Sequence, residues 1–367
     1  MPIGEVGPFL QQIRTHFTAW DGDKDGKLSF GEIELACTDP TVKGQAAVAA
    51  ATMRNLAKLR GLTLDEYTTA LMTTEGGKPN TFESSFAAAE KKLAGINREV
   101  FPSGMPKGGQ LAQGKLGDCF LLAGVGTMAQ VQPQRLKKLV DELPDGKTAV
   151  NFGNGEKVVL PLPTDAEVLI GASTRGDGVW GNVFEKAIGE RYRLRGKGSR
   201  TATPFAAIGG GGTPNVPLSM LTGNKSKREG CEMFQKPGLD EAGKANRLEE
   251  IRVALESAFK DGRLVIGGTG PLSHRKISDV STDKGSITVA GLYYNHSYGV
   301  LGYDRKTDLV TFWNPMSNGF TPKGESGLEN GYKTSYGRFE CPLKETVMWF
   351  GSFSIEQSEK LDETAEK

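Results

Sequence analysis

The chain has 367 residues, of which 37% are hydrophobic and 24% are charged, and its formal net charge at pH 7 is +1. A chain of this length is too long for one compact core, so we expect two or three domains. The near-neutral charge excludes a global field that would recruit nucleic acid or an anionic membrane.

No apolar run is long enough to span a bilayer, and residues 1–12 lack the basic start and apolar centre of a signal peptide. The four cysteines are widely scattered and form neither a disulfide framework nor a CxxC metal pattern. They are Cys37, Cys119, Cys231 and Cys341. We therefore expect a soluble cytoplasmic protein with reduced thiols and no membrane span, and the sequence leaves its oligomeric state open.

Residues 21–32, DGDKDGKLSFGE, match an EF-hand calcium loop at every position. Carboxylates stand at the first, third and fifth positions, a glycine at the sixth and a glutamate at the twelfth. Apolar residues before and after the loop provide faces for an entering and a leaving helix. Ca²⁺ is the expected cofactor. Its expected ligands are Asp21, Asp23, Asp25, Lys27 through its backbone carbonyl, and Glu32.

The next segment repeats only the second half of this loop. Leu62, Thr63 and Glu66 match the leucine, serine and glutamate of the first loop. The three aspartate positions are filled instead by Asn55, Ala57 and Leu59. The sequence therefore predicts an all-α EF-hand pair over 1–75, in which the second hand binds no calcium.

Beyond a turn-rich junction, a short helix near residues 82–96 is predicted within a linker at 76–100. Because this junction separates the calcium loop from the rest, a fragment starting near residue 77 is expected to fold and act alone. The range 101–223 is mixed, with a helix after Cys119, a strand pair near 149–163 and a helix near 178–192. The range 224–357 is predicted to be rich in strands, at 263–268, 286–291, 298–303, 309–313 and 346–353. A charged tail, 358–367, is expected to fray.

The stretch QGKLGDCFLLAG, residues 113–124, places Cys119 before a run of apolar and small residues at helical spacing. Asp118 is a plausible N-cap, which puts Cys119 in the first turn of a buried helix. The helix end favours an anion there, so the thiol is expected to ionise more easily and to suit a nucleophile. The alternative is an ordinary buried cysteine.

A thiol nucleophile needs an imidazole and a group that orients the ring. Of the three histidines, His16 falls on the first EF-hand helix and His274 in a polar loop, whereas His296 opens a strand. If the DRKTD turn is centred near Arg305, His296 and Asn314 lie roughly opposite one another on adjoining strands. A one-residue slip would remove this pairing, and the two residues would then be an ordinary strand histidine and asparagine.

The segments QGKLGDCFLLA, NHSYGVLGY and WNP resemble, in this order, the active-site motifs of the calpain family of cysteine proteases over roughly residues 101–355. The resemblance implies that Cys119 is the nucleophile, His296 the general base and acid, and Asn314 the orienting residue. It also implies that Gln113 donates to the oxyanion, together with the backbone N–H of Cys119.

The same resemblance matches Gly210 and Gly211 to glycines that line the substrate cleft and bind peptide backbone. It implies an α+β fold with a papain-like core, in which a helical subdomain (101–223) carries the nucleophile and a β-rich subdomain (224–357) carries the histidine and asparagine. The EF-hand domain precedes this core. The expected partner is a protein or peptide substrate.

Several residues depart from the family pattern. Phe120 and Met316 stand where the family usually has tryptophan, and Asn295 stands where a glycine commonly precedes the histidine. Gln110 replaces an acidic residue that helps bind calcium in the core of many members, so calcium control of the core itself is not expected. Two alternatives remain: a catalytically silent calcium-sensing or scaffold protein with this fold, and a transglutaminase-like acyl-transfer enzyme, in which the third residue is usually aspartate.

Overall fold

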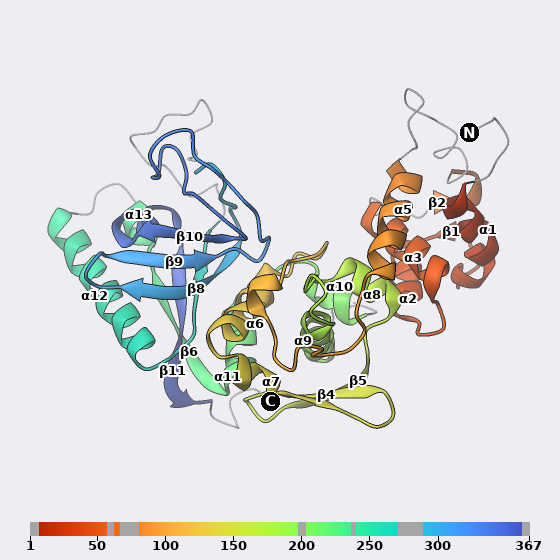
Figure 1. The fold of residues 1–367 in the computed structure, drawn as a ribbon, viewed down its shortest axis with the longest axis horizontal. Coiled ribbons are helices and arrows are strands. Elements are labelled where there is room, and N and C mark those ends of the chain that lie inside the picture. The colour runs from red at the N-terminus through yellow and green to blue at the C-terminus, as the bar shows by residue number, and fades with distance from the viewer. Residues whose placement is uncertain are drawn as a thin grey trace.

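The computed structural model describes residues 7–56, 62–66, 81–196, 203–235, 240–270 and 289–361. Three parts lie side by side: a set of N-terminal helices, a central helical part that carries a three-stranded sheet, and a six-stranded sheet (Figure 1). Within the described residues, no helix combines the length and the apolar composition needed to cross a bilayer.

Among the described residues, the N-terminal part packs three helices around an alanine-rich one. Its elements are α1 (Pro8–Trp20), β1 (Lys27–Leu28), α2 (Phe30–Thr38), α3 (Gly44–Leu56), β2 (Leu62–Thr63) and α5 (Thr81–Ala94). Proline at the start of α1 and a Ser29–Glu32 capping box at the start of α2 fix where these helices begin. Every residue of α3 from Ala46 to Met53 is buried, because its small side chains let the surrounding helices approach closely.

The apolar face predicted for the helix before the calcium loop is confirmed, since α1 buries all four residues on which it rested: Phe9, Leu10, Ile13 and Phe17. The helix after the loop differs from its expected face. Ile33 is buried, but Leu35 is 52% exposed and the neighbouring Glu34 is only 2% exposed. A charged residue therefore occupies the interior side of α2, where periodicity alone predicts an apolar one.

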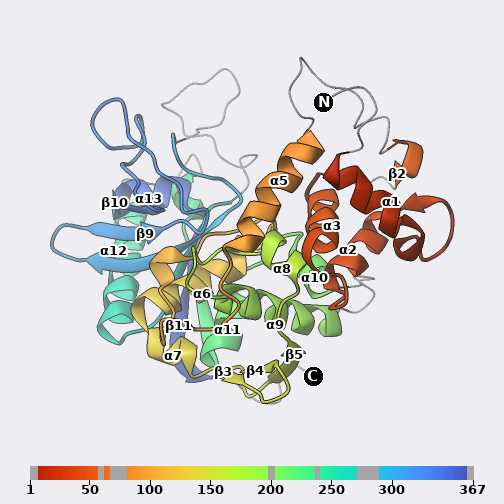
Figure 2. The same ribbon diagram turned by 45° about the vertical axis from the view of Figure 1, so that its right-hand side comes forward.

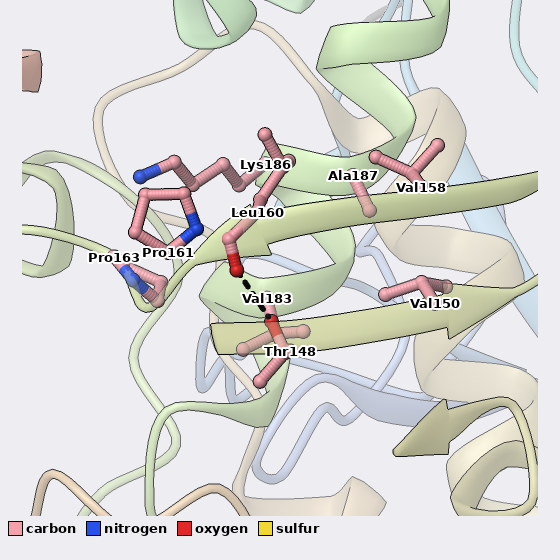
Figure 3. A pocket seen from close by; sticks show the side chains of 9 residues that line it. All are labelled: Thr148, Val150, Val158, Leu160, Pro161, Pro163, Val183, Lys186 and Ala187. Carbon is pink, nitrogen blue, oxygen red and sulfur yellow. Dashed lines mark hydrogen bonds between the residues drawn. The ribbon is translucent and has the colours of Figure 1, made fainter. Parts of the chain in front are cut away.

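The central part contains the predicted strand pair and the two predicted helices. Its helices are α6 (Cys119–Val131), α7 (Pro133–Lys137), α8 (Asp165–Ile170), α9 (Trp180–Arg195), α10 (Pro204–Ile208) and α11 (Asn215–Thr222), with a 3-10 turn η1 (Gly108–Gln110). Strands β3 (Val140–Glu142), β4 (Lys147–Asn151) and β5 (Lys157–Pro161) form an antiparallel sheet. A hollow between β4, β5 and α9 is lined mainly by aliphatic side chains such as Val150 and Val183 (Figure 3). It is too narrow to hold a water molecule and is a packing seam.

The third part is an antiparallel sheet with the strand order β10-β9-β8-β7-β11-β6. Its strands are β6 (Asn224–Gly230), β7 (Val265–Gly268), β8 (Ser297–Asp304), β9 (Leu309–Trp313), β10 (Arg338–Pro342) and β11 (Ser352–Lys360), and its helices are α12 (Glu241–Lys260), α13 (Leu343–Trp349) and the 3-10 turn η2 (Glu232–Gln235). The sheet buries a different core on each face. Ile266 and Trp313 join the core shared with α6, whereas Val265 and Phe312 join the core under α12 and α13.

Three expectations for this part are corrected. Residues 346–353 form the end of α13 and the start of β11 rather than one strand, because Leu343 and Val347 face the core at helical spacing. Residues 289–291 form a turn, while 286–288 lie outside the described residues. The tail predicted to fray begins inside β11, where Lys360 pairs with Asn224 on β6, and 362–367 lie outside the described residues.

One continuous apolar core joins the N-terminal helices to the central part. It extends from Phe9 through Val48 to Phe120 and Trp313. The indole of Trp313 packs so closely on α6 that a Cβ atom at Gly126 would lie 2.3 Å from its ring. The shared core argues against the expectation that a fragment starting near residue 77 folds alone. The domain boundaries at 1–75, 76–100, 101–223, 224–357 and 358–367 stay predictions.

Candidate active site

Cys119 is the first residue of α6, as predicted, and the next ten residues of this helix are all buried. Asp118 occupies the N-cap position, but its side chain makes no capping hydrogen bond, so that part of the prediction is wrong. The carboxyl group is fully buried instead, where it interacts with the side chains of Glu185 and Gln113. The start of the helix is therefore set by the turn at Gly117 and Asp118 and by the apolar run that follows, rather than by a side-chain cap.

Asp118 lies beside a second buried carboxyl group, that of Glu185 on α9. Glu185 accepts hydrogen bonds from the backbone N–H of Ala172 at 2.9 Å and from Asn182 Nδ2 at 3.1 Å. Burial raises the pKa of Asp118 to about 7, and burial together with the charge of Asp118 raises the pKa of Glu185 well above its ordinary value. Two such groups cannot both ionise, so the pair holds a proton next to Cys119 at neutral pH.

The Cys119 thiol lies where α6 meets β8, next to Ser297. Burial raises the pKa of Cys119, and hydrogen bonds with Ser297 and with the backbone N–H of Phe120 only partly oppose this shift. The expected easier ionisation is therefore wrong for the protein without substrate, because desolvation outweighs the favourable field of the helix end. The thiol is neutral at rest and needs a base to become a nucleophile.

His296 immediately precedes β8, and Asn314 immediately follows the neighbouring strand β9. Nε2 of the imidazole lies 2.8 Å from Oδ1 of Asn314, so the predicted hydrogen bond is present. Asn314 is itself fixed, because its Nδ2 donates to Asn318 Oδ1 at 2.8 Å and its Oδ1 also accepts from the backbone N–H of Met316 at 2.9 Å. The carbonyl of Asn314 thereby holds the proton on Nε2 and leaves Nδ1 as the basic nitrogen.

The pairing that underlies this bond differs from the predicted one. Asp304 pairs with Leu309, so the turn is centred beyond Arg305, and the register shifts by one residue between Val300 and Gly302. Continuing the register places Tyr298, rather than His296, opposite Asn314. The histidine and asparagine are therefore diagonal neighbours on one face, a separation that an imidazole and an amide can still bridge.

Burial lowers the pKa of His296 to about 4, and the hydrogen bond that the ring donates to Asn314 only partly opposes this shift. Tyr298 and Tyr293 surround the ring, with centroids 5.0 and 5.7 Å from that of the imidazole. The ring is consequently neutral at physiological pH and can accept a proton from the thiol.

The low pKa of His296 predicts a stability loss at acid pH. This histidine becomes protonated below pH 6.5 in the unfolded chain, but only near pH 4 in the folded chain. The free energy of unfolding therefore falls as the pH is lowered from 6.5 to about 4. The expected loss is about 3 kcal/mol. Asp118 and Glu185 titrate in the opposite sense. Urea unfolding of wild type and of His296→Gln from pH 4 to 7 therefore measures the effect as the difference between the two proteins. If the free energy of unfolding depends on pH equally in both, the prediction is wrong.

Gln113 lies in the loop before Cys119 and links the central part to the six-stranded sheet. Its backbone N–H donates to the oxygen of Pro315, the residue after Asn314, at 2.8 Å. Its side-chain Nε2 donates to the oxygen of Leu116 at 2.7 Å, which leaves the second amide hydrogen for another acceptor. One backbone hydrogen bond thus ties the loop of Gln113 to the residue that follows Asn314.

Gly210 and Gly211 lie directly after α10, beside the turn that leads to Cys119. Gly117 N donates to the oxygen of the preceding residue, Gly209, at 3.1 Å. Both glycines are exposed, and Gly211 has a φ of +88°, a conformation that disfavours other residues. An added Cβ at Gly210 would meet nothing within 4 Å. This open backbone beside the thiol is compatible with a peptide lying across it.

The motifs and the geometry agree with the comparison to known families. The model of the calpain family of cysteine proteases matches residues 91–324, which is more than half of the chain. The chain belongs to the calpain family. No curated protein sequence matches it. A mixed helix and sheet fold with a calpain protease domain supports a cysteine peptidase that acts on protein substrates.

One contact across this calpain site was not predicted. Arg175, from the central part, donates to Ser317 Oγ at 2.8 Å and lies over the ring of Tyr336, 5.4 Å from its centroid. All three residues have positive φ angles near 50°, which is uncommon outside glycine. Ser317 follows Asn314 in the same loop, so this strained contact connects the two halves of the calpain site. No residue pattern in the sequence signals it.

Three of the predicted calcium ligands lie together in the loop between α1 and α2. Oxygen atoms of Asp21, Asp23 and Asp25 lie within 4.8 Å of one another. Glu32 is not in this group, because its Oε1 accepts from Gly22 N at 2.7 Å and its Oε2 from Ser29 N at 2.8 Å. Of the other two histidines, His16 stacks on the ring of Trp20 in α1, and His274 lies outside the described residues.

Proposed function

We propose that this calpain-family protein is an endopeptidase that hydrolyses internal peptide bonds with Cys119, His296 and Asn314 as a catalytic triad. The observation that carries the proposal is the 2.8 Å hydrogen bond between His296 and Asn314. The residue after His296 is Ser297, which forms hydrogen bonds with the Cys119 thiol. The four cysteines are free, which supports a reducing compartment and hence the cytoplasm.

The reaction begins with proton transfer from the Cys119 thiol to Nδ1 of His296 as sulfur attacks the substrate carbonyl carbon. The carbonyl oxygen gains negative charge, which the side-chain amide of Gln113 and the backbone N–H of Cys119 stabilise. The imidazolium then gives its proton to the leaving amine, and the C–N bond breaks to leave a thioester. Water, deprotonated by the same ring, hydrolyses the thioester and releases the acid and the free thiol.

Active-site labelling tests this proposal. We expect iodoacetamide to modify Cys119 much faster than the other three thiols at neutral pH, because Cys37, Cys231 and Cys341 are buried, whereas Cys119 is partly exposed and lies beside the strand opened by the proposed base, His296. Peptide mapping by mass spectrometry after short reaction times measures the four rates, and His296→Gln is the control that removes the base. Equal rates at Cys119 in wild type and this variant would contradict a thiol–imidazole pair.

The same experiment separates the proposal from its alternatives. A calcium-sensing or scaffold protein with a silent site is favoured by the raised pKa of the thiol, and it predicts slow labelling and no peptide cleavage. A transglutaminase-like enzyme would release ammonia from glutamine peptides in the presence of an amine. An asparagine at the third position, held by Asn318 and Met316, supports the protease instead.

We further propose that residues 21–32 bind one calcium ion as the first hand of an EF-hand pair. Three carboxylates converge there, and hard oxygen donors suit Ca²⁺. Leu28 pairs with Leu62 across the short β1–β2 ladder, the two residues matched in the sequence alignment of the hands. Asp21, Asp23, Asp25, the carbonyl of Lys27 and Glu32 would hold the ion once the Glu32 carboxylate turns from its backbone partners.

Calorimetry checks this site with a matched control. We expect one calcium per chain, with at least about a tenfold weaker affinity in Glu32→Gln, because the bidentate twelfth ligand is lost. Glu66→Gln is the control: Glu66 makes the same reciprocal bonds with Thr63 that Glu32 makes with Ser29, but its loop lacks the aspartates. Two calcium ions per chain, or equal weakening by both variants, would contradict the assignment.

A further inference from the structure

Two short helices, α8 and α10, run from the N-terminal helices to the loop that ends at Cys119 (Figure 2). Each begins at a buried threonine whose hydroxyl bonds to α2. Thr203 Oγ1 donates to Glu34 Oε2 at 2.9 Å, and Thr164 Oγ1 donates to the oxygen of Cys37 at 2.5 Å. Both hydroxyls also accept from the first turn of their own helix. Each threonine is therefore both the cap of its helix and the link to α2.

The opposite ends of these helices contact the catalytic loop. Lys115 N donates to the oxygen of Ile170, the last residue of α8, at 2.8 Å. Gly117 N donates to the oxygen of Gly209, directly after α10, at 3.1 Å. An added Cβ at Gly117 would lie 2.6 Å from that oxygen, so the approach is too close for any side chain there. Both helices thus end on the residues that lead into Cys119.

The end of this connection on α2 is a fully paired, buried charge. Glu34 is 2% exposed, its Oε1 lies 2.6 Å from Nε of Arg54 on α3, and its Oε2 accepts from Thr203. A buried carboxylate is costly unless its partners are all present. The position of Thr203 is consequently specified by a charge, which tolerates less displacement than an apolar contact does.

We propose that Thr203 and Thr164, held by Glu34 and the α2 backbone, are positioning residues for the reaction. Acting through α10 and α8, they fix the loop 113–119, which carries both the proposed oxyanion donor and the nucleophile. The inference rests on the proposed protease function. It assigns the N-terminal helices a part in the geometry of the site, in addition to any effect of calcium.

Kinetic measurements distinguish a positioning role of these threonines from a merely structural one. A docking contact changes how much protein is folded, whereas a positioning contact changes how the folded protein reacts. A displacement of 1 Å can lower a rate by about a hundredfold. Partial release of one of these two helices is therefore expected to lower kcat and the Cys119 labelling rate about tenfold, with little change in KM.

The experiment compares Thr203→Val, Thr164→Val and their double variant with Thr203→Ser and Thr164→Ser, in the full chain at one fixed calcium concentration. Peptide cleavage and iodoacetamide labelling of Cys119 are measured under conditions where urea unfolding shows each variant folded. The valine variants should react slowly, and the serine variants, which keep the hydroxyl, should recover the wild-type rates.

The matched control is Thr346→Val. Thr346 is fully buried in α13, and its hydroxyl donates to the oxygen of Pro342 at 3.1 Å, so its loss should cost comparable stability without touching the 113–119 loop. Wild-type rates in both folded valine variants would overturn the inference. If Thr203→Val does not fold, Glu34→Gln replaces it, since it removes the charge that Thr203 contacts; if Thr164→Val does not fold, Thr164→Ala replaces it. Unchanged labelling in the replacement variants overturns the inference equally. Absence of cleavage by the wild type would instead count against the protease proposal.

Discussion

Cys119→Ala is expected to abolish peptide cleavage, because Cys119 is the thiol that lies against the strand opened by His296. His296→Ala should lower kcat at least about a thousandfold, because it removes the proposed acceptor of the thiol proton. Asn314→Ala should cost less, about ten- to a hundredfold, because it orients the ring without transferring a proton. Cleavage of a fluorogenic peptide by purified variants measures all three effects.

The control is Cys231→Ala, which removes a buried thiol from the core on the far face of the sheet. This variant should cleave at the wild-type rate while losing some stability. Cleavage retained by Cys119→Ala, or an Asn314→Ala variant that is slower than His296→Ala, would refute the assigned roles.

Removal of residues 1–77 is expected to prevent folding of the remainder. The fragment would expose the faces of α5 and α8 that now pack against α3, together with the partners of Phe9 and Met53 in the shared core. Only about 5–15 kcal/mol typically separates folded from unfolded protein, so exposure of these apolar faces is expected to be enough to prevent folding. The fragment would also leave Thr203 without its carboxylate partner.

Soluble yield, circular dichroism and urea unfolding of the fragment measure this outcome. Removal of residues 1–6 alone is the control and should leave a chain that folds, because it keeps Phe9, the first of the described residues in the shared core. A cooperatively folded fragment that cleaves peptides would instead support the separable module expected from the sequence.

Local patterns predicted several features that the structure contains. The helix after Cys119 and the apolar face of α1 follow directly from residue spacing. The bond between His296 and Asn314 was also predicted, although by a register that was wrong. The bond survives because a shift of two residues keeps both side chains on one face, whereas a shift of one would have separated them.

Other features depend on distant residues and leave no local signal. Glu34 is buried because Arg54 and Thr203 reach it, and these partners stand 20 and 169 positions away. The pKa of Cys119 is raised because the thiol is buried between α6 and β8. The position of a cysteine at a helix start does not reveal this burial. The proposed calcium ligands and the triad remain predictions of role, although the structure brings together Asp21, Asp23 and Asp25.

The fit of Trp313 over Gly126 restricts how this site can change during evolution. The indole lies directly before Asn314 in sequence and touches the helix that starts at Cys119, so it sets the spacing between the two halves of the triad. A single added methyl group at position 126 would clash with the indole and push α6 away from β9. Lineages that acquire alanine there are therefore expected to carry a smaller residue at position 313, and the two positions should covary among relatives that retain catalysis.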